Sequence, residues 1–363
     1  MSDYTMYDYV QETRNAALHI LKKSETLCDS FASRYSERNY TRIWLVGSGT
    51  SYNACYTAKY FMEKTLKIPC VLATSYDFAH YESVFYPEKD LMIAVTQEGE
   101  STNTIDAIQR AKSMKMDNFV VTEALDNTCT QVADGKVTLD CGREFVGPKT
   151  KGYTCTLLTL YIMAIEAARA KKMVNPSEYA QLMERLHSTM DNVDNVVSAT
   201  EKWFEQNKED LRPCEKCYVL GYGANAGTAI EGALKSLETV RFAFFPFAVE
   251  EFLHGPIASV KPDVYTILVA PPTYGYERAN RLFKSMNEQH AHVYSIGAQD
   301  GVESTHVLAG PFVNDEDFAT LEYCVPLQLF AYLLYSAKGI NLNVRNYPHT
   351  KDALQTKAKP LQR

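Results

Sequence analysis

The stretch IWLVGSG at residues 43–49 decides the fold, because it joins an apolar run of strand length to a turn with two glycines. Helical periodicity follows at 52–65, as expected where a buried strand leads through a tight turn into a helix. The same arrangement returns in CYVLGYG at residues 217–223. The chain is therefore predicted to contain one α/β domain twice.

Short apolar runs alternate with longer amphipathic segments on both sides of a helical segment at 176–207. The runs expected to be strands are 43–46, 70–73, 91–96, 119–122, 137–139, 217–220, 242–245, 265–270, 292–296 and 307–308. Continuous apolar strands between helices indicate a parallel sheet covered on both faces. The predicted fold class is α/β, with two tandem domains that are each a doubly wound, flavodoxin-like or Rossmann-like parallel sheet with helices on both faces.

The expected organisation has five parts. They are an N-terminal helical segment at 1–40, a first domain at 41–175, a linking helix at 176–209, a second domain at 210–340 and a tail at 341–363. A closing helix at 321–338 leads into the tail. Counted from Lys338, the last residues hold six Lys or Arg against one Asp, a local charge of +5. We expect this tail to lie over the active site and attract an anionic substrate.

The 363 residues carry 37 Lys and Arg against 44 Asp and Glu, a net charge of −7. This balance argues against nucleic acid as a partner, because that binding depends on clustered cations. The longest apolar stretches, 155–165 and 325–334, are shorter than the roughly 20 residues of a membrane helix. No signal-peptide pattern begins the chain, and nine scattered cysteines are typical of reduced thiols. We expect a soluble, cytoplasmic protein with no membrane partner.

The cysteines also bear on metal binding. Cys214 and Cys217 form the single C-x2-C pair, and no second pair of Cys or His matches it. Structural zinc sites need four such ligands, so we interpret the two residues as ordinary thiols beside a strand and expect no metal.

The first candidate ligand site is the turn after the first strand, which contains Ser48, Gly49, Thr50 and Ser51. Free N–H groups at a helix N-terminus favour an anion, and hydroxyl groups can complete its coordination. A dinucleotide is disfavoured, because the G-x-G-x-x-G pattern needs a glycine where this chain has Tyr52. A Ser- and Thr-rich helix cap without a ligand stays open as the alternative.

A second polar turn follows the third predicted strand. It contains Thr96, Gln97, Glu98 and Ser101. Because ligands of open parallel sheets gather at the carboxyl ends of neighbouring strands, the two turns are expected to face one ligand.

Glu231, Lys235 and Glu238 recur at helical spacing and therefore share one face of a predicted helix. A solvated ion pair is the plain alternative, but the small and apolar residues around them favour a buried helix. His254 stands at a turn before Gly-Pro. A carboxylate and a histidine can divide a proton transfer between them, so Glu238 and His254 are the candidate acid–base pair.

Five motifs in order resemble the tandem sugar isomerase (SIS) domain family. They are GTSYN at 49–53, Q-x-GE at 97–100, EGALK-x-x-E at 231–238, HGP at 254–256 and VPLQL at 325–329. The family includes the isomerase domains of glucosamine-6-phosphate synthases, fructosamine-6-phosphate deglycases and amino-sugar-phosphate deaminases. The resemblance covers about residues 40 to 340, and the sixteen-residue spacing of Glu238 and His254 is part of it.

The resemblance implies roles for individual residues. Ser51, Thr96, Gln97 and Ser101 would hold the phosphate of a sugar phosphate, and Glu231 and Lys235 would lie beside the substrate. Glu238 would move a proton between C1 and C2 of the open-chain sugar. His254 would assist from the partner subunit, which implies a homodimer with its active site at the subunit interface. No cofactor is required.

The family also places a lysine of the C-terminal tail near the sugar. Lys351 is the nearest candidate for this catalytic lysine, and Lys357 is the alternative.

Two positions depart from the synthase pattern, in which serines stand in place of Glu98 and Lys149. A carboxylate beside a phosphate is repulsive unless it is compensated. We interpret Glu98 and Lys149 as a joint exchange, either as an ion pair or as readers of a charged substituent on the substrate. The short segment before the first strand, with Ser2 after Met1, further implies no glutaminase domain and no nitrogen transfer from glutamine.

The function expected from these residues is that of a fructosamine 6-phosphate deglycase acting through C1/C2 proton transfer and an enolamine. An aldose–ketose phosphosugar isomerase and a glucosamine-6-phosphate deaminase share this mechanism and are the alternatives. A non-catalytic sugar-phosphate sensor is the alternative from another class, and the retained Glu238 and His254 disfavour it.

Overall fold

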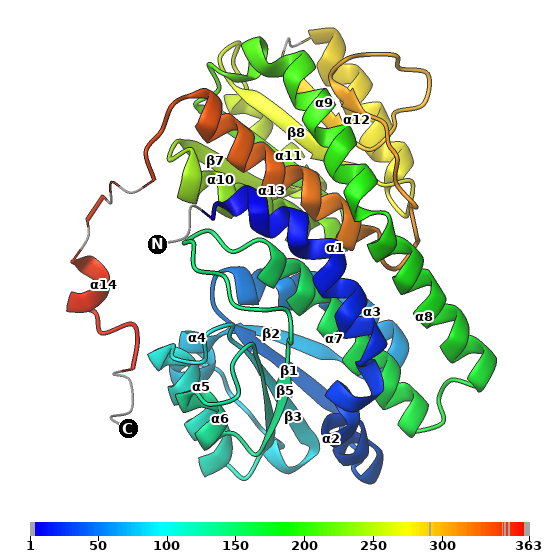
Figure 1. Ribbon diagram of the computed structural model, residues 1–363, viewed down its shortest axis with the longest axis vertical. Helices are drawn as coiled ribbons and strands as arrows, with labels where there is room; N and C mark the ends of the chain where they lie inside the picture. Colours follow the sequence, from blue (N-terminus) through cyan, green and yellow to red (C-terminus); the bar gives the residue numbers. More distant parts are fainter. Residues whose placement is uncertain (1–3, 290–291, 343, 345, 348, 359–363) are drawn as a thin grey trace. The chain divides into compact units, whose positions relative to one another are not determined.

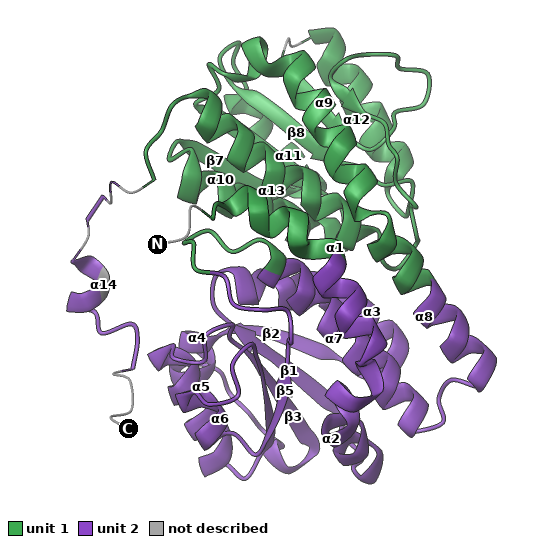
Figure 2. Cartoon of the chain, viewed as in Figure 1, with its two compact units in different colours: residues 1–14, 145–151, 185–342 green, residues 15–144, 152–184, 343–363 purple. Residues whose placement is uncertain are grey.

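The computed structural model describes residues 4–289, 292–342, 344, 346–347 and 349–358. The chain forms two compact units, each built around one sheet (Figures 1 and 2). Unit 2 contains residues 15–144, 152–184 and 343–363, and unit 1 contains residues 1–14, 145–151 and 185–342.

The sheet of unit 2 has five parallel strands in the order β2-β1-β3-β4-β5. The strands are β1 (Arg42–Gly47), β2 (Cys70–Thr74), β3 (Asp90–Val95), β4 (Asp117–Thr122) and β5 (Gly135–Thr138). The central strand β3 is buried along its whole length. This is why its sequence is continuously apolar after Asp90, whose carboxylate accepts a hydrogen bond from the indole of Trp44.

The sheet of unit 1 repeats this topology with the order β7-β6-β8-β9-β10. Its strands are β6 (Lys216–Gly221), β7 (Ala243–Ala248), β8 (Tyr265–Val269), β9 (Val293–Ile296) and β10 (Val307–Leu308). In both sheets the first strand lies between the second and the third. The predicted α/β class and the duplication of one parallel-sheet domain are confirmed.

Helices connect the parallel strands and bury the apolar faces of the sheets. They are α1 (Met6–Lys22), α2 (Ser24–Glu37), α3 (Thr50–Leu66), α4 (Ser75–His80), α5 (Thr102–Ser113), α6 (Thr128–Val132), α7 (Lys151–Ala170), α8 (Pro176–Asp191), α9 (Val193–Leu211), α10 (Ala224–Thr239), α11 (Val249–Leu253), α12 (Tyr276–Gln289), α13 (Ala319–Ala337) and α14 (Thr350–Ala353). Short 3-10 helices occupy Pro87–Lys89 and Pro256–Ser259. Among the helices that are described, none combines the length and the apolarity needed to cross a membrane.

Two helical predictions differ from the structure. The N-terminal helical segment, predicted at 1–40, contains two helices that break at Lys23, and the linking helix at 176–209 is two helices that break at Asn192. The closing helix runs through Pro326 without ending. The strand expected at 242–245 is β7, which extends to Ala248 as an edge strand. Breaks of one residue do not disturb helical periodicity enough to be visible in the sequence.

All nine cysteines are buried thiols, including Cys214 and Cys217. Within the described ranges, no three His, Cys, Asp or Glu side chains come together as possible metal ligands.

In unit 1, α10 packs closely against α13 because Gly232 has no side chain. A Cβ atom at this position would lie 2.5 Å from Cδ1 of Leu327. Gly232→Ala is therefore expected to reduce the free energy of unfolding by about 1–3 kcal/mol, since overpacking forces neighbouring atoms to shift. Urea-induced unfolding measures the change.

The matched control is Gly147→Ala, because a Cβ there would meet nothing within 4 Å. This variant is expected to stay within about 0.5 kcal/mol of the wild type. Equal stabilities of the two variants would contradict the close contact between α10 and α13.

Candidate active site

The turn after β1 is open and lies at the N-terminus of α3. Gly49 has a φ of 57° at the N-cap of α3, and a Cβ there would meet nothing within 4 Å. Ser48 and Gly49 are exposed. Thr50 and Ser51 begin the helix and are half-buried. The four predicted residues thus form one exposed hydroxyl-rich turn at a helix N-terminus, where an anion is favoured.

The turn after β3 lies beside this first turn, because β1 and β3 are hydrogen-bonded neighbours. Thr96 is buried and continues the strand through its N–H, which donates to Val121 O at 3.0 Å. Gln97 donates to Glu144 Oε1 at 3.4 Å. Both turns stand at the carboxyl edge of the same sheet, as the sequence predicted.

Close packing holds the second turn in place. Gly99 has a φ of 72°, and a Cβ there would lie 2.0 Å from Cγ of Asn127. Gly152 leaves room for Gln97, whose Nε2 would lie 1.7 Å from a Cβ at that position. A side chain at Gly99 would be strained by the positive φ, and one at Gly152 would displace the amide of Gln97, so both glycines keep the second turn in its present position.

Ser101 is the N-cap of α5 and pairs with Lys357 of the tail in an antiparallel bridge. Lys357 also forms an ion pair with Glu98. Lys351 lies in α14, and its side chain is outside the described residues. Lys357, one of the two tail lysines that the sequence suggested, therefore lies at the second polar turn. Lys149 belongs to unit 1, and its pairing with Glu98 stays a prediction.

The charged cluster on α10 is buried. Side chains of Glu231 and Lys235 are each 1% exposed, and the ammonium Nζ of Lys235 lies 3.4 Å from Glu231 Oε1 and 2.6 Å from Glu238 Oε2. The alternative of a solvated ion pair is therefore wrong for Glu231 and Lys235. Glu238 is different, because its side chain is 38% exposed and can meet a ligand.

The charge of Lys235 is set by opposing effects. Burial alone would lower its pKa, but the carboxylates of Glu231 and Glu238 outweigh burial and raise the pKa above the ordinary value. Because the folded-state pKa is raised, the resulting stabilisation is present at neutral pH and is lost only as pH rises through that value. The ammonium of Lys235 thus holds the Glu238 carboxylate through a contact of 2.6 Å.

His254 follows α11 and is exposed. Its backbone N–H donates to Glu251 O at 3.2 Å, and Gly255 next to it has a φ of 154°. These contacts place the imidazole on a tight turn at the surface, just beyond β7.

The topology separates Glu238 from His254 within one chain. α10 starts at the carboxyl edge of the sheet, next to Gly221, and its 16 residues return to the amino edge, where β7 begins at Ala243. Glu238 therefore lies about 20 Å from the carboxyl edge, at a rise of about 1.5 Å per residue. His254 follows the carboxyl end of β7, where Ala248 pairs with Gly221. The two residues stand near opposite edges of the sheet.

The turn after β6 repeats the backbone of the first turn but carries different side chains. Gly223 has φ 52° and ψ −124°, against 57° and −130° for Gly49. Instead of hydroxyl groups, this turn carries Tyr222, which donates to Glu250 Oε1 at 2.8 Å, while Arg278 binds the same carboxylate at 2.6 and 2.8 Å. This network could not be predicted from the sequence, because no short-range pattern links Tyr222, Glu250 and Arg278.

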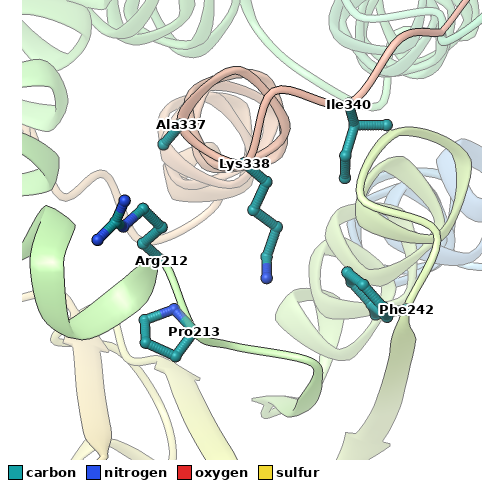
Figure 3. A pocket seen from close by; sticks show the side chains of 6 residues that line it. All are labelled: Arg212, Pro213, Phe242, Ala337, Lys338 and Ile340. Atoms are coloured by element: carbon teal, nitrogen blue, oxygen red, sulfur yellow. The ribbon is translucent and has the colours of Figure 1, made fainter.

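Unit 1 also has a hollow that the sequence analysis missed. Figure 3 shows Arg212 and Lys338 beside it, with Pro213, Phe242, Ala337 and Ile340 completing the lining. Lys338 Nζ lies 4.7 Å from the centre of the Phe242 ring. Arg212 and Lys338 are the C-cap residues of α9 and α13, so both cations compensate the negative ends of helix dipoles.

Two parallel five-stranded sheets of the same strand order, one with an open hydroxyl-rich turn, define a duplicated α/β protein. The model of the SIS domain matches residues 38–166. The chain belongs to the SIS domain family, with two such domains in tandem.

Relatives of known sequence and structure agree with this assignment. The glutamine–fructose-6-phosphate aminotransferase (isomerizing) of Pyrococcus horikoshii is 27% identical over 309 residues, which are 83% of this chain and 50% of that protein. The chain thus spans about half the length of the curated relatives it matches. A Salmonella typhimurium LT2 structure, provisionally assigned to sugar binding, is 30% identical with a TM-score of 0.79 and covers 90% of this chain and 99% of its own.

A second structure, from Clostridium difficile 630, is provisionally assigned as a phosphosugar isomerase. It is 24% identical with a TM-score of 0.90 and covers 98% of this chain and 99% of its own. At this identity the likeness concerns the fold.

The buried ion pair on α10 generates a prediction about stability. Lys235→Met leaves the Glu231 carboxylate buried without its ammonium partner, so the free energy of unfolding is expected to fall by about 3–5 kcal/mol. Chemical denaturation measures the loss. The double variant Glu231→Gln/Lys235→Met is expected to be more stable than Lys235→Met alone.

The control for this prediction is Lys208→Met, which removes an exposed ion pair with Glu205 at 3.1 Å. Its effect is expected to stay within about 0.5 kcal/mol. A Lys235→Met protein as stable as this control would contradict the buried pair.

Proposed function

We propose that the protein is a sugar-phosphate-processing enzyme and, more specifically, a fructosamine 6-phosphate deglycase. The observation that carries the proposal is the partly exposed Glu238 carboxylate, held 2.6 Å from the buried ammonium of Lys235. A carboxylate fixed in this way can act as a general acid–base over two neighbouring carbon atoms of one substrate.

The phosphate of the substrate is proposed to bind at the two turns of unit 2. The N-terminus of α3 supplies N–H groups, and Ser48, Thr50 and Ser51 supply hydroxyl groups. Thr96, Gln97 and Ser101 complete the site from the neighbouring strand.

In the proposed reaction, Glu238 takes a proton from C1 of the open-chain fructosamine, and the C2 carbonyl oxygen gains a proton. The product is an enolamine. Protonation at C2 and loss of the N–H proton from the nitrogen on C1 then give an imine at C1, and the hydroxyl group stays on C2. Water adds to this imine, the C1–N bond breaks, and glucose 6-phosphate and a free amine are released. Each step is a proton transfer or a hydrolysis, and acid–base groups of the chain are sufficient for it.

A homodimer is part of the proposal. Glu238 and His254 stand near opposite edges of one sheet, so a site that uses both takes them from two copies of the chain. Leu237, the neighbour of Glu238 on α10, is an apolar side chain that is 44% exposed. Exposed apolar residues of this kind favour contact with another protein surface.

Two other reactions share the enolamine mechanism, namely aldose–ketose isomerisation and deamination of glucosamine 6-phosphate. The aminotransferase relatives favour chemistry on amino sugars or fructose 6-phosphate, which fits all three reactions. A sensor without catalysis is disfavoured, because a binding protein has no use for a carboxylate positioned like Glu238.

The first test compares products on a panel of substrates. With a fructosamine 6-phosphate, glucosamine 6-phosphate and fructose 6-phosphate, we expect amine release from the first and little turnover of the others. Ammonia from glucosamine 6-phosphate would instead support the deaminase, and interconversion of sugars without amine release the isomerase. Binding without exchange of the C1 or C2 protons with solvent deuterium would support the sensor.

Glu238→Gln is expected to lower kcat for amine release by roughly 10²- to 10⁴-fold, because the base that moves the proton is lost. Proton exchange at C1, followed by NMR in deuterium oxide, should fall in parallel. The control is Glu209→Gln, on the exposed end of α9. Full activity of the Glu238→Gln protein would refute its role.

A mixing experiment tests the shared site. Glu238→Gln and His254→Asn proteins are each expected to be inactive. When the two are co-refolded, half of the dimers are mixed and each mixed dimer has one intact site, so about a quarter of wild-type activity should return. Mixed dimers without activity would show that each chain builds its own site.

A further inference from the structure

The C-terminal tail of the chain runs along the second polar turn of unit 2. The N–H of Thr102 donates to Thr356 O at 3.2 Å, and the N–H of Ala358 donates to Glu100 O at 2.9 Å. These two bonds flank the antiparallel bridge between Ser101 and Lys357. The tail therefore adds a short strand segment at the N-terminus of α5.

This pairing determines where the side chain of Lys357 points. The bonds lie on either side of Ser101 and Lys357, so these residues form a non-hydrogen-bonded pair, whose side chains lie close together on one face. Ser101 is a proposed phosphate ligand. Lys357 is thus carried to the phosphate turn by backbone contacts alone.

The ammonium of Lys357 donates to Glu98 Oε2 on the same turn. An ammonium group has three N–H donors, so two are available to another acceptor while one binds Glu98. The side chain of Lys357 is 60% exposed and that of Glu98 is 34% exposed, so this region is accessible to a ligand.

We propose that Lys357 is a phosphate ligand of this site and that Glu98 is the residue that positions it. The inference rests on the proposed function, because it takes the turn at 96–101 as the binding site of a phosphate group. Carboxylate, ammonium and phosphate would then form a chain of alternating charges.

This arrangement resolves the conflict of an acidic residue in a phosphate-binding turn. Alone, Glu98 repels the phosphate. With Lys357 bound to it, the nearest charge that the phosphate meets is positive, and a charge-assisted hydrogen bond replaces the repulsion. Because an exposed ion pair contributes little to stability, the pair is expected to act on ligand binding rather than on folding.

The test measures binding of inorganic phosphate and of fructose 6-phosphate by calorimetric titration at constant ionic strength. Lys357→Met should weaken the binding of both ligands by about tenfold or more, because the remaining Glu98 carboxylate repels the ligand. The double variant Glu98→Gln/Lys357→Met should bind at least about threefold more tightly than Lys357→Met, because the repulsion is gone. The affinity for unphosphorylated fructose should be the same for all of these proteins.

The matched control is Lys112→Met, which removes a lysine at the opposite end of α5. It should leave phosphate binding within about twofold of the wild type. Melting temperatures of all variants check that none is unfolded.

Two results would overturn the inference. If Lys357→Met binds phosphate like the control, Lys357 is not a ligand. If the double variant binds as weakly as Lys357→Met, the lysine only secures the tail, since removing Glu98 then brings no gain.

If the proposed function is wrong, the binding and turnover results differ from those that would overturn the inference about Lys357. Phosphate binding that depends on Lys357, without turnover of any sugar phosphate, would refute the enzyme but retain the inference. A wild-type protein that binds neither phosphate nor fructose 6-phosphate would refute both.

Discussion

A parallel sheet with both faces buried brings the carboxyl ends of all its strands to one edge, and the polar site of this protein depends on that constraint. In unit 2, β1 and β3 are neighbours, so the turns that follow them lie side by side although they are about 50 residues apart in the sequence. The positive φ of Gly49 then turns the chain directly into α3 and leaves the helix N-terminus open. The order of the strands thus brings the two turns together, and the conformation of Gly49 leaves the N-terminus of α3 accessible.

The two copies of the domain carry different side chains on the same backbone turn. The turns at Gly49 and Gly223 have nearly the same φ and ψ, but hydroxyl groups surround only the former. Tyr222, bound to Glu250, occupies the corresponding place in unit 1. The polar chemistry of unit 1 lies instead on α10, at the other edge of its sheet. The same fold thus offers two different edges for function, one in each copy.

Local patterns were sufficient to predict the sheets and both polar turns, because strand hydrophobicity and G-x-G turns depend on residues close in sequence. The face shared by Glu231, Lys235 and Glu238 could also be predicted. Its burial could not be derived from spacing alone, because it depends on how α10 packs in unit 1. Lys357 and Glu98 stand 259 residues apart, and the family resemblance suggested only that Lys351 or Lys357 lies near the sugar, not that Lys357 pairs with Glu98. Their pairing follows from the course of the tail, which only the structure gives.

The distribution of charge explains why a tail lysine has a place in a phosphate site. Lys235 is a buried cation near the proposed chemistry, but Glu231 and Glu238 surround it with two negative charges. The three groups together carry a charge of −1, so Lys235 offers no net attraction to an anionic substrate. Its ammonium instead holds Glu238 in one position. In a chain with a net charge of −7, positive charge beside the proposed phosphate site comes from another segment. The basic tail can provide it without changing the acidic cluster that fixes Glu238.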